Sequence, residues 1–416
     1  MSSAGESLLS PEAAQELVLS HVRRLGAERV GLDACAGRVL ARPVTAAGDI
    51  PPADNSAMDG YAVRFADVAA ASPEQPAAVT MIDDIPAGAV GRAAVGPGQA
   101  SRIMTGAPLP AGADTVIRVE YTRAEAPGIG ARILVLQPEK AGANIRRRGE
   151  DMAAGQPVLP AGTCCGPAEI GTLAALRRSI VTVYRRPRLA ILSTGDELAE
   201  VEDEPGAGRI VNANAHALAA LARAAGAEPL VVPLARDREA ELRDAIAGAL
   251  DADLLVSSGG VSVGAYDLVK KVLADLGATT VLWGVAMTPG KPLFFAVLAG
   301  KPYFGLPGNP VSSMISFLQF VRPAVRKASG WPAAAWRLAE TTAVLATAAR
   351  NRGERRLYLR ARLCCAGGRL QADPLPAQGS HMLTSMLGAN GLVLLEPGQS
   401  AAAGEAVRVQ SIGPLL

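Results

Sequence analysis

The chain has 416 residues, of which 49% are apolar and 19% are charged. This balance is typical of a folded globular protein and excludes a largely disordered one, and the length predicts two to four domains. The formal net charge of +2 is too small to indicate a nucleic-acid-binding surface.

The five cysteines indicate neither a disulfide framework nor a zinc site, because their number is odd and no C-x-x-C spacing occurs. The three histidines are too dispersed in the sequence to suggest a metal cluster. The N-terminus lacks a basic-plus-apolar signal pattern, and no apolar run approaches about 18 residues. We therefore expect a protein of the reducing cytoplasm with no membrane span.

The first half of the chain reads as one short helix followed by β structure. Ser10 and Pro11 are a helix N-cap and its first residue, and apolar residues follow at helical spacing. A long polar loop at 51–60 is followed by a region in which Gly and Pro separate short Val/Ile-rich runs. This pattern predicts an all-β module up to about residue 150. A second helix is expected from Pro167, and a strand from 180 to 184.

From residue 188 the pattern changes to alternating strands and helices, which predicts a three-layer α/β domain with a mainly parallel sheet. Three polar loops follow strands of this region, at 194–198, 257–267 and 307–312. In such sheets the loops at the carboxyl ends of the strands line the ligand crevice. We expect Asn309 to cap the helix that begins at Pro310. The sequence of residues 331–416 again has strand-like patterns, which predict a small β domain.

The segment 257–267 is a Gly/Ser-rich turn that connects the end of a predicted strand to the start of a predicted helix. Such a turn places backbone N–H groups at the helix N-terminus, where an anion is favoured. A carboxylate in the first turn of the following helix, Asp267, suggests Mg²⁺ beside a phosphate. Taken alone, such a turn is as often a tight connection that binds nothing. The convergence of three polar loops favours a binding site.

Seven motifs in order resemble those of the molybdopterin molybdenumtransferase (MoeA) family, which includes the E domain of gephyrin. The matching runs are Asp54-Asn55-Ser56-Ala57-Met58-Asp59-Gly60-Tyr61-Ala62, Met104-Thr105-Gly106-Ala107-Pro108-Leu109-Pro110, Asn144-Ile145-Arg146 with Gly149-Glu150-Asp151, Ser193-Thr194-Gly195-Asp196-Glu197-Leu198, Ser257-Ser258-Gly259-Gly260-Val261-Ser262-Val263-Gly264 with Tyr266-Asp267, Pro289-Gly290-Lys291-Pro292, and Gly305-Leu306-Pro307-Gly308-Asn309-Pro310-Val311-Ser312. They cover nearly the whole chain.

The resemblance implies four domains and an elongated homodimer. Linker domain I would comprise 27–49 and 152–184, β-rich domain II 50–151, the α/β molybdopterin-binding domain III 1–26 and 185–330, and the C-terminal β-barrel domain IV 331–416. Domain III is similar to the single-domain, MogA-like molybdopterin adenylyltransferases. The active site would lie between domains III and IV of one subunit and domain II of the other.

The implied reaction inserts molybdenum from molybdate into adenylylated molybdopterin, with Mg²⁺-dependent cleavage of the pyrophosphate bond and release of AMP. Asp196, Glu197 and Asp267 would hold Mg²⁺. Asp59 and Asp151 of the other subunit would complete the polar shell, and Lys291 would attract molybdate. Candidate ligand-binding residues are Thr105, Thr194, Gly195, Ser257, Ser258, Gly259, Gly260, Ser262, Gly264, Pro307, Gly308, Asn309, Pro310, Ser312, Arg355 and Ser380.

One position departs from the family pattern. The family usually has a basic residue just before Pro-Gly-Lys, and Thr288 stands there in this chain. Either molybdate is attracted more weakly or a nearby arginine substitutes. The basic run Arg146-Arg147-Arg148 is either a solvated face or an aid to binding an anionic ligand.

Three other functions compete with this interpretation. A non-catalytic molybdopterin-binding or scaffold protein would keep the fold without the chemistry, but the carboxylates of the pattern are intact. A molybdopterin adenylyltransferase would need only the α/β domain. A dinucleotide-binding oxidoreductase lacks its G-x-G-x-x-G after a strand. Besides its small-molecule substrates, the resemblance implies transient contact with the adenylyltransferase and with acceptor molybdoenzymes, and neither nucleic acid nor membrane as partner.

Overall fold

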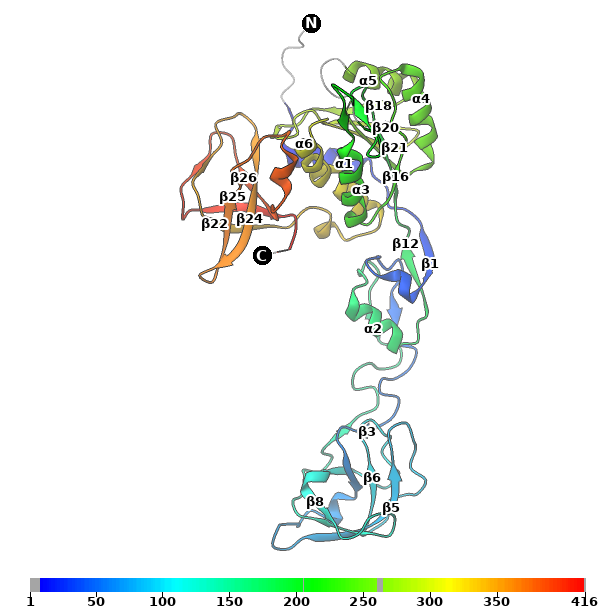
Figure 1. Ribbon diagram of the computed structural model, residues 1–416. Helices are drawn as coiled ribbons and strands as arrows, with labels where there is room; N and C mark the ends of the chain where they lie inside the picture. Colours follow the sequence, from blue (N-terminus) through cyan, green and yellow to red (C-terminus); the bar gives the residue numbers. More distant parts are fainter. Residues whose placement is uncertain (1–7, 205, 260–264, 415–416) are drawn as a thin grey trace. The chain divides into compact units, whose positions relative to one another are not determined.

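The computed structural model describes residues 8–204, 206–259 and 265–414, and the chain divides into two compact units (Figure 1). The first comprises residues 1–42, 162–170 and 179–416, and the second comprises 43–161 and 171–178. Each unit is described by itself. The four-domain division expected from the resemblance stays a prediction.

A six-stranded sheet forms the centre of the first unit. Its order is β16 (Glu228–Val231), β13 (Arg188–Ser193), β17 (Leu254–Ser258), β21 (Lys301–Leu306), β20 (Phe294–Leu298) and β18 (Thr279–Trp283). The first four strands run parallel to one another, whereas β20 and β18 are joined to their neighbours antiparallel. The mainly parallel sheet expected from the sequence is therefore present, and the carboxyl ends of four strands meet at one edge.

Helices cover both faces of this sheet (Figure 1). One apolar core contains Leu189 and Ile191 of β13, together with side chains from four helices. These helices are α1 (Pro11–Ser20), α3 (Ala213–Ala225), α6 (Pro310–Ser316) and α7 (Arg322–Ala328). The alternate residues Ala190 and Leu192 face a second core with α4 (Glu239–Gly248) and α5 (Ala265–Asp275). This alternation explains why the strands are apolar on both sides.

The C-terminal part of the first unit is a closed β-barrel. Its strands are β22 (Glu340–Leu345), β24 (Arg356–Ala366), β25 (Arg369–Pro374), β26 (Gly391–Leu395) and β28 (Ala406–Ser411). The additional pairing of β24 with β26 closes the order β24-β25-β22-β28-β26 into a ring. Leu359, Ala361 and Leu363 fill the barrel, whereas Tyr358, on the opposite face of β24, packs into the core beside α1. The barrel and the α/β part thus share apolar packing.

Short strands complete the first unit. They are β1 (Ala27–Gly31) paired with β12 (Ile180–Tyr184), β14 (Leu198–Ala199) with β15 (Ile210–Val211), β23 (Ala349–Arg350) with β27 (Ser400–Ala401), and β19 (Met287–Thr288) with β24. The β19 pairing joins the segment before Pro289 directly to the barrel.

The second unit is built on another six-stranded sheet, which agrees with the expected β module. The order is β7 (Thr115–Arg118), β4 (Gly60–Val63), β6 (Gln99–Ile103), β5 (Ala77–Ile85), β9 (Arg132–Val135) and β8 (Thr122–Ala124). Two further pairs are β10 (Ile145–Arg146) with β3 (Asn55–Ser56) and β11 (Pro157–Leu159) with β2 (Val44–Thr45). Gly60 is required at the start of β4, because a Cβ there would lie 2.0 Å from the carbonyl oxygen of Ile117.

Helix starts agree in part with the sequence. Ser10 caps α1, since its Oγ accepts a hydrogen bond from the Ala13 N–H at 3.2 Å, and α2 (Pro167–Ala175) begins at the expected proline. The expected capping by Asn309 is wrong in one respect. It occupies the N-cap position of α6, but its side chain makes no capping hydrogen bond. None of the described helices is long and apolar enough to cross a membrane.

Candidate functional site

A crevice of about 440 Å³ lies at the carboxyl ends of β13, β17 and β21. The first loop after β13 contributes Thr194 and Glu197, and β17 ends in the crevice at Ser258 and Gly259. The predicted residues that line it are Thr194, Glu197, Ser258, Gly259, Pro307, Gly308, Asn309 and Pro310. The three loops predicted to converge therefore do so among the described residues.

Asn214 joins two of these loops and was missed by the sequence interpretation. Its Nδ2 donates to the Ser258 Oγ and to the Gly308 carbonyl oxygen, both at 2.8 Å. It lies in the first turn of α3, two residues after Asn212, whose side chain accepts a hydrogen bond from the Ala215 N–H. The run Asn212-Ala213-Asn214 resembles ordinary capping chemistry in the sequence, so only the fold reveals the second asparagine as a bridge.

The end of β17 brings the Ser258 side chain and the Gly259 backbone to the crevice. Gly259 has φ +91°, and a Cβ at this position would lie 2.8 Å from the Thr194 carbonyl oxygen, so two of the loops touch through their backbones. Ser257, a predicted ligand-binding residue, is only 1% exposed and does not line the crevice, and Ser312 in α6 is also buried. The geometry favours Ser258 as the hydroxyl donor. Gly260, Ser262 and Gly264 lie outside the described residues.

Carboxylates cluster at the β13 loop. The Asp196 Oδ1 lies 3.4 Å from the Asp237 backbone N–H, and the Asp237 Oδ1 accepts from the Thr194 hydroxyl at 2.7 Å. The Asp237 side chain therefore holds this loop, and Arg238 occupies the N-cap position of α4. Glu197 folds back against Gly195, where an added Cβ would lie 2.5 Å from its Oε2. Both Asp196 and Glu197 are exposed, and neither forms an ion pair within the described part of the chain.

These carboxylates alone do not form a closed metal site. No group of three or more Asp, Glu, His or Cys side chains among the described residues is arranged to hold a metal ion. Asp267 belongs to α5, but its side chain lies outside what the structure describes. Of the Asp196 and Glu197 carboxylates, that of Glu197 lines the crevice and that of Asp196 does not. An exposed carboxylate at a crevice suits Mg²⁺, which usually takes only one or two protein carboxylates and completes its shell with water and phosphate oxygens. The donor set therefore fits a magnesium ion shared with a phosphate ligand.

The barrel contributes Ser380 to this end of the α/β part. The Asn309 Nδ2 donates to the Ser380 Oγ at 3.1 Å, and the Val311 N–H donates to the Ser380 carbonyl oxygen at 3.1 Å. The loop before Ser380 is held to β24, because Gln378 exchanges two hydrogen bonds with the Arg360 backbone, at 3.0 and 2.9 Å. Asn309 thus contacts the barrel with the side chain that was expected to cap α6.

Two cationic residues predicted to bind the substrates, Lys291 and Arg355, are located near the β19–β24 pairing. β19 ends at Thr288, three residues before Lys291, and β24 begins one residue after Arg355. Lys291 is exposed, and within the described residues neither its ammonium group nor the Arg355 guanidinium has a hydrogen-bond or ion-pair partner. Thr288 in β19 pairs with Leu357 in β24. The position that departs from the family pattern therefore lies beside the start of β24, which Arg355 immediately precedes.

In the second unit, Asp59 and Thr105 are brought together. The Asp59 Oδ1 accepts from both the N–H and the hydroxyl of Thr105 at 2.7 Å, and these hydrogen bonds hold the pKa of Asp59 below its ordinary value. Asp151 is exposed, and its side chain has no partner in the described part of this chain. Both carboxylates are therefore accessible to a ligand or to another chain.

The basic run of the second unit has structural partners. The Arg147 guanidinium lies 2.6 Å from an Asp54 oxygen, and Arg148 pairs with Asp49 at 2.5 Å. Arg146 is exposed in β10. Of the two alternatives left open for this run, the structure supports a structural role for Arg147 and Arg148 in holding the loop at 144–151.

Three family models match the chain in order. They are the MoeA N-terminal region (domain I and II) over residues 9–176, a probable molybdopterin binding domain over 190–327, and the MoeA C-terminal region (domain IV) over 342–412. A molybdopterin molybdenumtransferase of Nostoc sp. is 46% identical over 312 residues, which is 73% of this chain and 71% of the relative.

Two further similarities extend over nearly the whole chain. Molybdopterin molybdenumtransferase 2 of Mycobacterium tuberculosis is 39% identical over 91% of this chain and 93% of its own length. The crystal structure of a molybdopterin biosynthesis MoeA protein from Pyrococcus horikoshii OT3 superposes with a TM-score of 0.81 at 28% identity, covering 97% of this chain and all of that one.

Proposed function

This chain is a transferase of the MoeA family, and we propose that it inserts molybdenum from molybdate into adenylylated molybdopterin. The Nostoc and Mycobacterium relatives named above are molybdopterin molybdenumtransferases. In the proposed reaction the dithiolene of the pterin receives molybdenum, the pyrophosphate bond is cleaved, and AMP leaves. The crevice at the ends of β13, β17 and β21 is the observation that supports this reaction most directly.

The crevice has the chemistry to hold a phosphorylated pterin. Ser258 and Thr194 supply hydroxyl groups, and Asn214 fixes the Ser258 hydroxyl and the Gly308 carbonyl in one orientation. Because Asn214 already links the two loops, the site is organised before ligand binds and loses little conformational entropy on binding. We assign pterin and phosphate binding to these loops, together with Gly260, Ser262 and Gly264.

Asp196, Glu197 and Asp267 would hold Mg²⁺ beside the pyrophosphate. When bound, the ion would neutralise phosphate charge as the pyrophosphate bond breaks. The role of the protein is to present two exposed carboxylates, at Asp196 and Glu197, on a loop whose backbone is fixed by Thr194 and Asp237.

Molybdate, as substrate, would bind where the barrel meets the α/β part. Lys291 supplies a point charge, Arg355 a planar guanidinium, and Ser380 a hydroxyl held against Asn309. The unpaired cations are consistent with this role, since a tetrahedral oxyanion would provide the partner that the described residues do not. Thr288 supplies no charge in place of the usual basic residue, and Arg355, two residues before Leu357, the β24 partner of Thr288, would compensate for it.

We also propose that a second copy of the chain completes the site. Asp59, Thr105 and Asp151 would come from its β module and supply a polar shell around the ligand. All three residues are exposed, and the hydrogen bonds from Thr105 hold the pKa of Asp59 below its ordinary value, which suits that role. A homodimer with a composite active site follows from this proposal.

The test is molybdate-dependent AMP release. Purified protein is incubated with adenylylated molybdopterin, Mg²⁺ and molybdate, and AMP is followed by chromatography, with parallel reactions that lack molybdate or Mg²⁺. We expect AMP only in the complete mixture. Binding of adenylylated molybdopterin without any molybdate-dependent AMP release would contradict the transferase proposal and support the non-catalytic scaffold alternative.

A further inference from the structure

The N-terminal segment forms a third strand-like row beside β19 and β24. Leu9 forms a parallel bridge with Val285, and the Ala286 N–H donates to the Leu9 carbonyl oxygen at 2.9 Å. The Arg356 N–H in turn donates to the Ala286 carbonyl oxygen at 3.1 Å. The backbone that leads to Thr288 and Lys291 is therefore held between residue 9 on one side and the start of β24 on the other.

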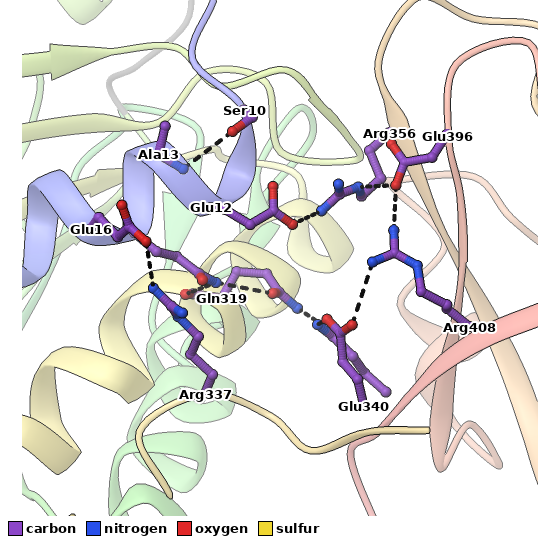
Figure 2. Close-up of polar contacts among 12 residues, drawn as sticks. Ser10, Glu12, Ala13, Glu16, Gln319, Arg337, Glu340, Arg356, Glu396 and Arg408 are labelled. Carbon is purple, nitrogen blue, oxygen red and sulfur yellow. Dashed lines mark hydrogen bonds and ion pairs between the residues drawn. The ribbon is translucent and has the colours of Figure 1, made fainter. Parts of the chain in front are cut away.

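The same N-terminal segment contacts β24 through a side chain. Glu12, in the first turn of α1, forms an ion pair with the Arg356 guanidinium, and the Arg356 Nε donates to the Glu396 Oε1 at 2.9 Å (Figure 2). Glu396 also contacts Arg408, whose guanidinium lies 3.6 Å from Glu340. Arg356 thus lies between two carboxylates, one from α1 and one from the barrel.

Amides complete this set of contacts and return to α1. The Gln410 Nε2 donates to the Glu340 Oε1 at 2.9 Å, the Gln319 Nε2 donates to the Gln410 Oε1 at 2.7 Å, and the Gln15 Nε2 donates to the Gln319 carbonyl oxygen at 2.9 Å (Figure 2). Gln15 and Glu12 are on the same helix, so the contacts form a closed ring that begins and ends on α1. We call these residues the α1 ring.

The α1 ring neutralises one of two adjacent arginines, Arg356, and not the other, Arg355. The Arg356 side chain is only 11% exposed and is neutralised by its two carboxylates. Burial opposes the ionisation of Glu12, but the hydrogen bonds from Arg356 and from its own backbone N–H, together with the charges of Arg356 and Arg408, outweigh burial, so the pKa of Glu12 lies below its ordinary value of 4.5. Arg355, one residue earlier, has no carboxylate partner among the described residues. One arginine is committed to structure and its neighbour is left for a ligand.

We propose that Glu12 is a positioning residue for the oxyanion end of the site. Through Arg356 it fixes the start of β24, and with Leu9 it fixes β19, so that Arg355 and Lys291 are held at a set separation. Neutralising Arg356 also keeps it from competing with Arg355 for the anion. This inference rests on the proposed function, because it takes Arg355 and Lys291 as the molybdate-binding cations.

A purely structural role for the α1 ring predicts something different. If Glu12 only fastened the barrel, its loss would lower the melting temperature and affect every kinetic parameter through the fraction of folded enzyme. A positioning role instead changes the response to molybdate and leaves the response to adenylylated molybdopterin unchanged, because no residue that lines the crevice belongs to α1.

The experiment compares Glu12→Gln and Glu12→Lys with Glu16→Gln. Glu16 is one turn further along α1 and 3.7 Å from Arg337, in a pair exposed at both partners and outside the ring. We expect the KM for molybdate to rise about tenfold in Glu12→Gln and further in Glu12→Lys, which places a cation against Arg356. The KM for adenylylated molybdopterin should match that of Glu16→Gln, even if loss of the ion pair lowers the Tm.

Two results would overturn the inference. One is a molybdate KM in Glu12→Gln equal to that of Glu16→Gln, and the other is a parallel rise of both KM values together with a loss of Tm. If the wild type releases no AMP, the proposed function fails, and equilibrium dialysis with radiolabelled molybdate alone still decides the inference. Weaker molybdate binding in Glu12→Gln than in the wild type supports it, whereas equal binding or no binding to either protein overturns it.

Discussion

The crevice of the first unit and the acidic loops of the second differ in how complete they are. In the crevice, Asn214 links two loops, and Asn309 links the α/β part to the barrel. In the second unit, Asp59 is fixed by Thr105, but Asp151 has no partner among the described side chains. Internal hydrogen bonds organise the crevice in advance, whereas the acidic loops present accessible charge that a ligand or another chain must meet.

The largest effect should come from damaging only the second unit. In Gly60→Ala the added Cβ would lie 2.0 Å from the Ile117 carbonyl oxygen, a contact that β4 and β7 cannot relieve without shifting. We expect the second unit to lose about 3 kcal/mol of stability, with a corresponding loss of AMP release. Gly48→Ala is the matched control, because nothing lies within 4 Å of its Cβ. Equal melting curves for the two variants would show that β4 tolerates the side chain.

Damage to the crevice should affect ligand binding without unfolding. Asn214→Ala removes both bridging hydrogen bonds and leaves α3 intact, so the KM for adenylylated molybdopterin should rise about tenfold while the KM for molybdate stays unchanged. His216→Ala, exposed on the same helix, is the control. An unchanged nucleotide KM in Asn214→Ala would mean that the pre-organised bridge does not contribute to binding.

The smallest effect concerns the missing cation. Thr288→Lys restores a basic residue beside the start of β24 and should lower the molybdate KM about twofold, the range of a solvent-exposed charge pair. Thr288→Gln is the control for added bulk, because the glutamine side chain is similar in length to lysine and carries no charge. Identical molybdate KM values in the three proteins would indicate that Arg355 and Lys291 already supply the charge that this position adds.

Much of the fold is predictable from local patterns. Ser10-Pro11 and Pro167 mark helix starts because capping and the fixed proline φ are local effects. The alternating strand and helix pattern indicates the parallel sheet, and the carboxyl-end rule for such sheets indicates which loops meet. Thr194, Glu197, Ser258 and Gly259 were found in this way.

The long-range contacts are not predictable in the same way. Asn214 bonds to residues 44 and 94 positions away, and Asn309 to a residue 71 positions away, so no local pattern distinguishes either from an ordinary cap. Arg356 and Arg355 are the same residue type side by side, and the positions of Glu12 on α1 and of Glu396 in the barrel decide which one is neutralised. Arg147 and Arg148 were ambiguous for the same reason, because their partners Asp54 and Asp49 are over 90 residues away.

Mixed dimers test most directly whether the crevice and the acidic loops form one site. Asp267→Asn and Asp59→Asn should each lower molybdate-dependent AMP release about 100-fold or more while leaving the chain folded. When the two variants are mixed and their subunits exchange, half of the dimers combine one copy of each and contain one intact composite site. Our account predicts recovery to about a quarter of wild-type activity. Activity that stays at the level of the single variants would contradict a site shared between two copies.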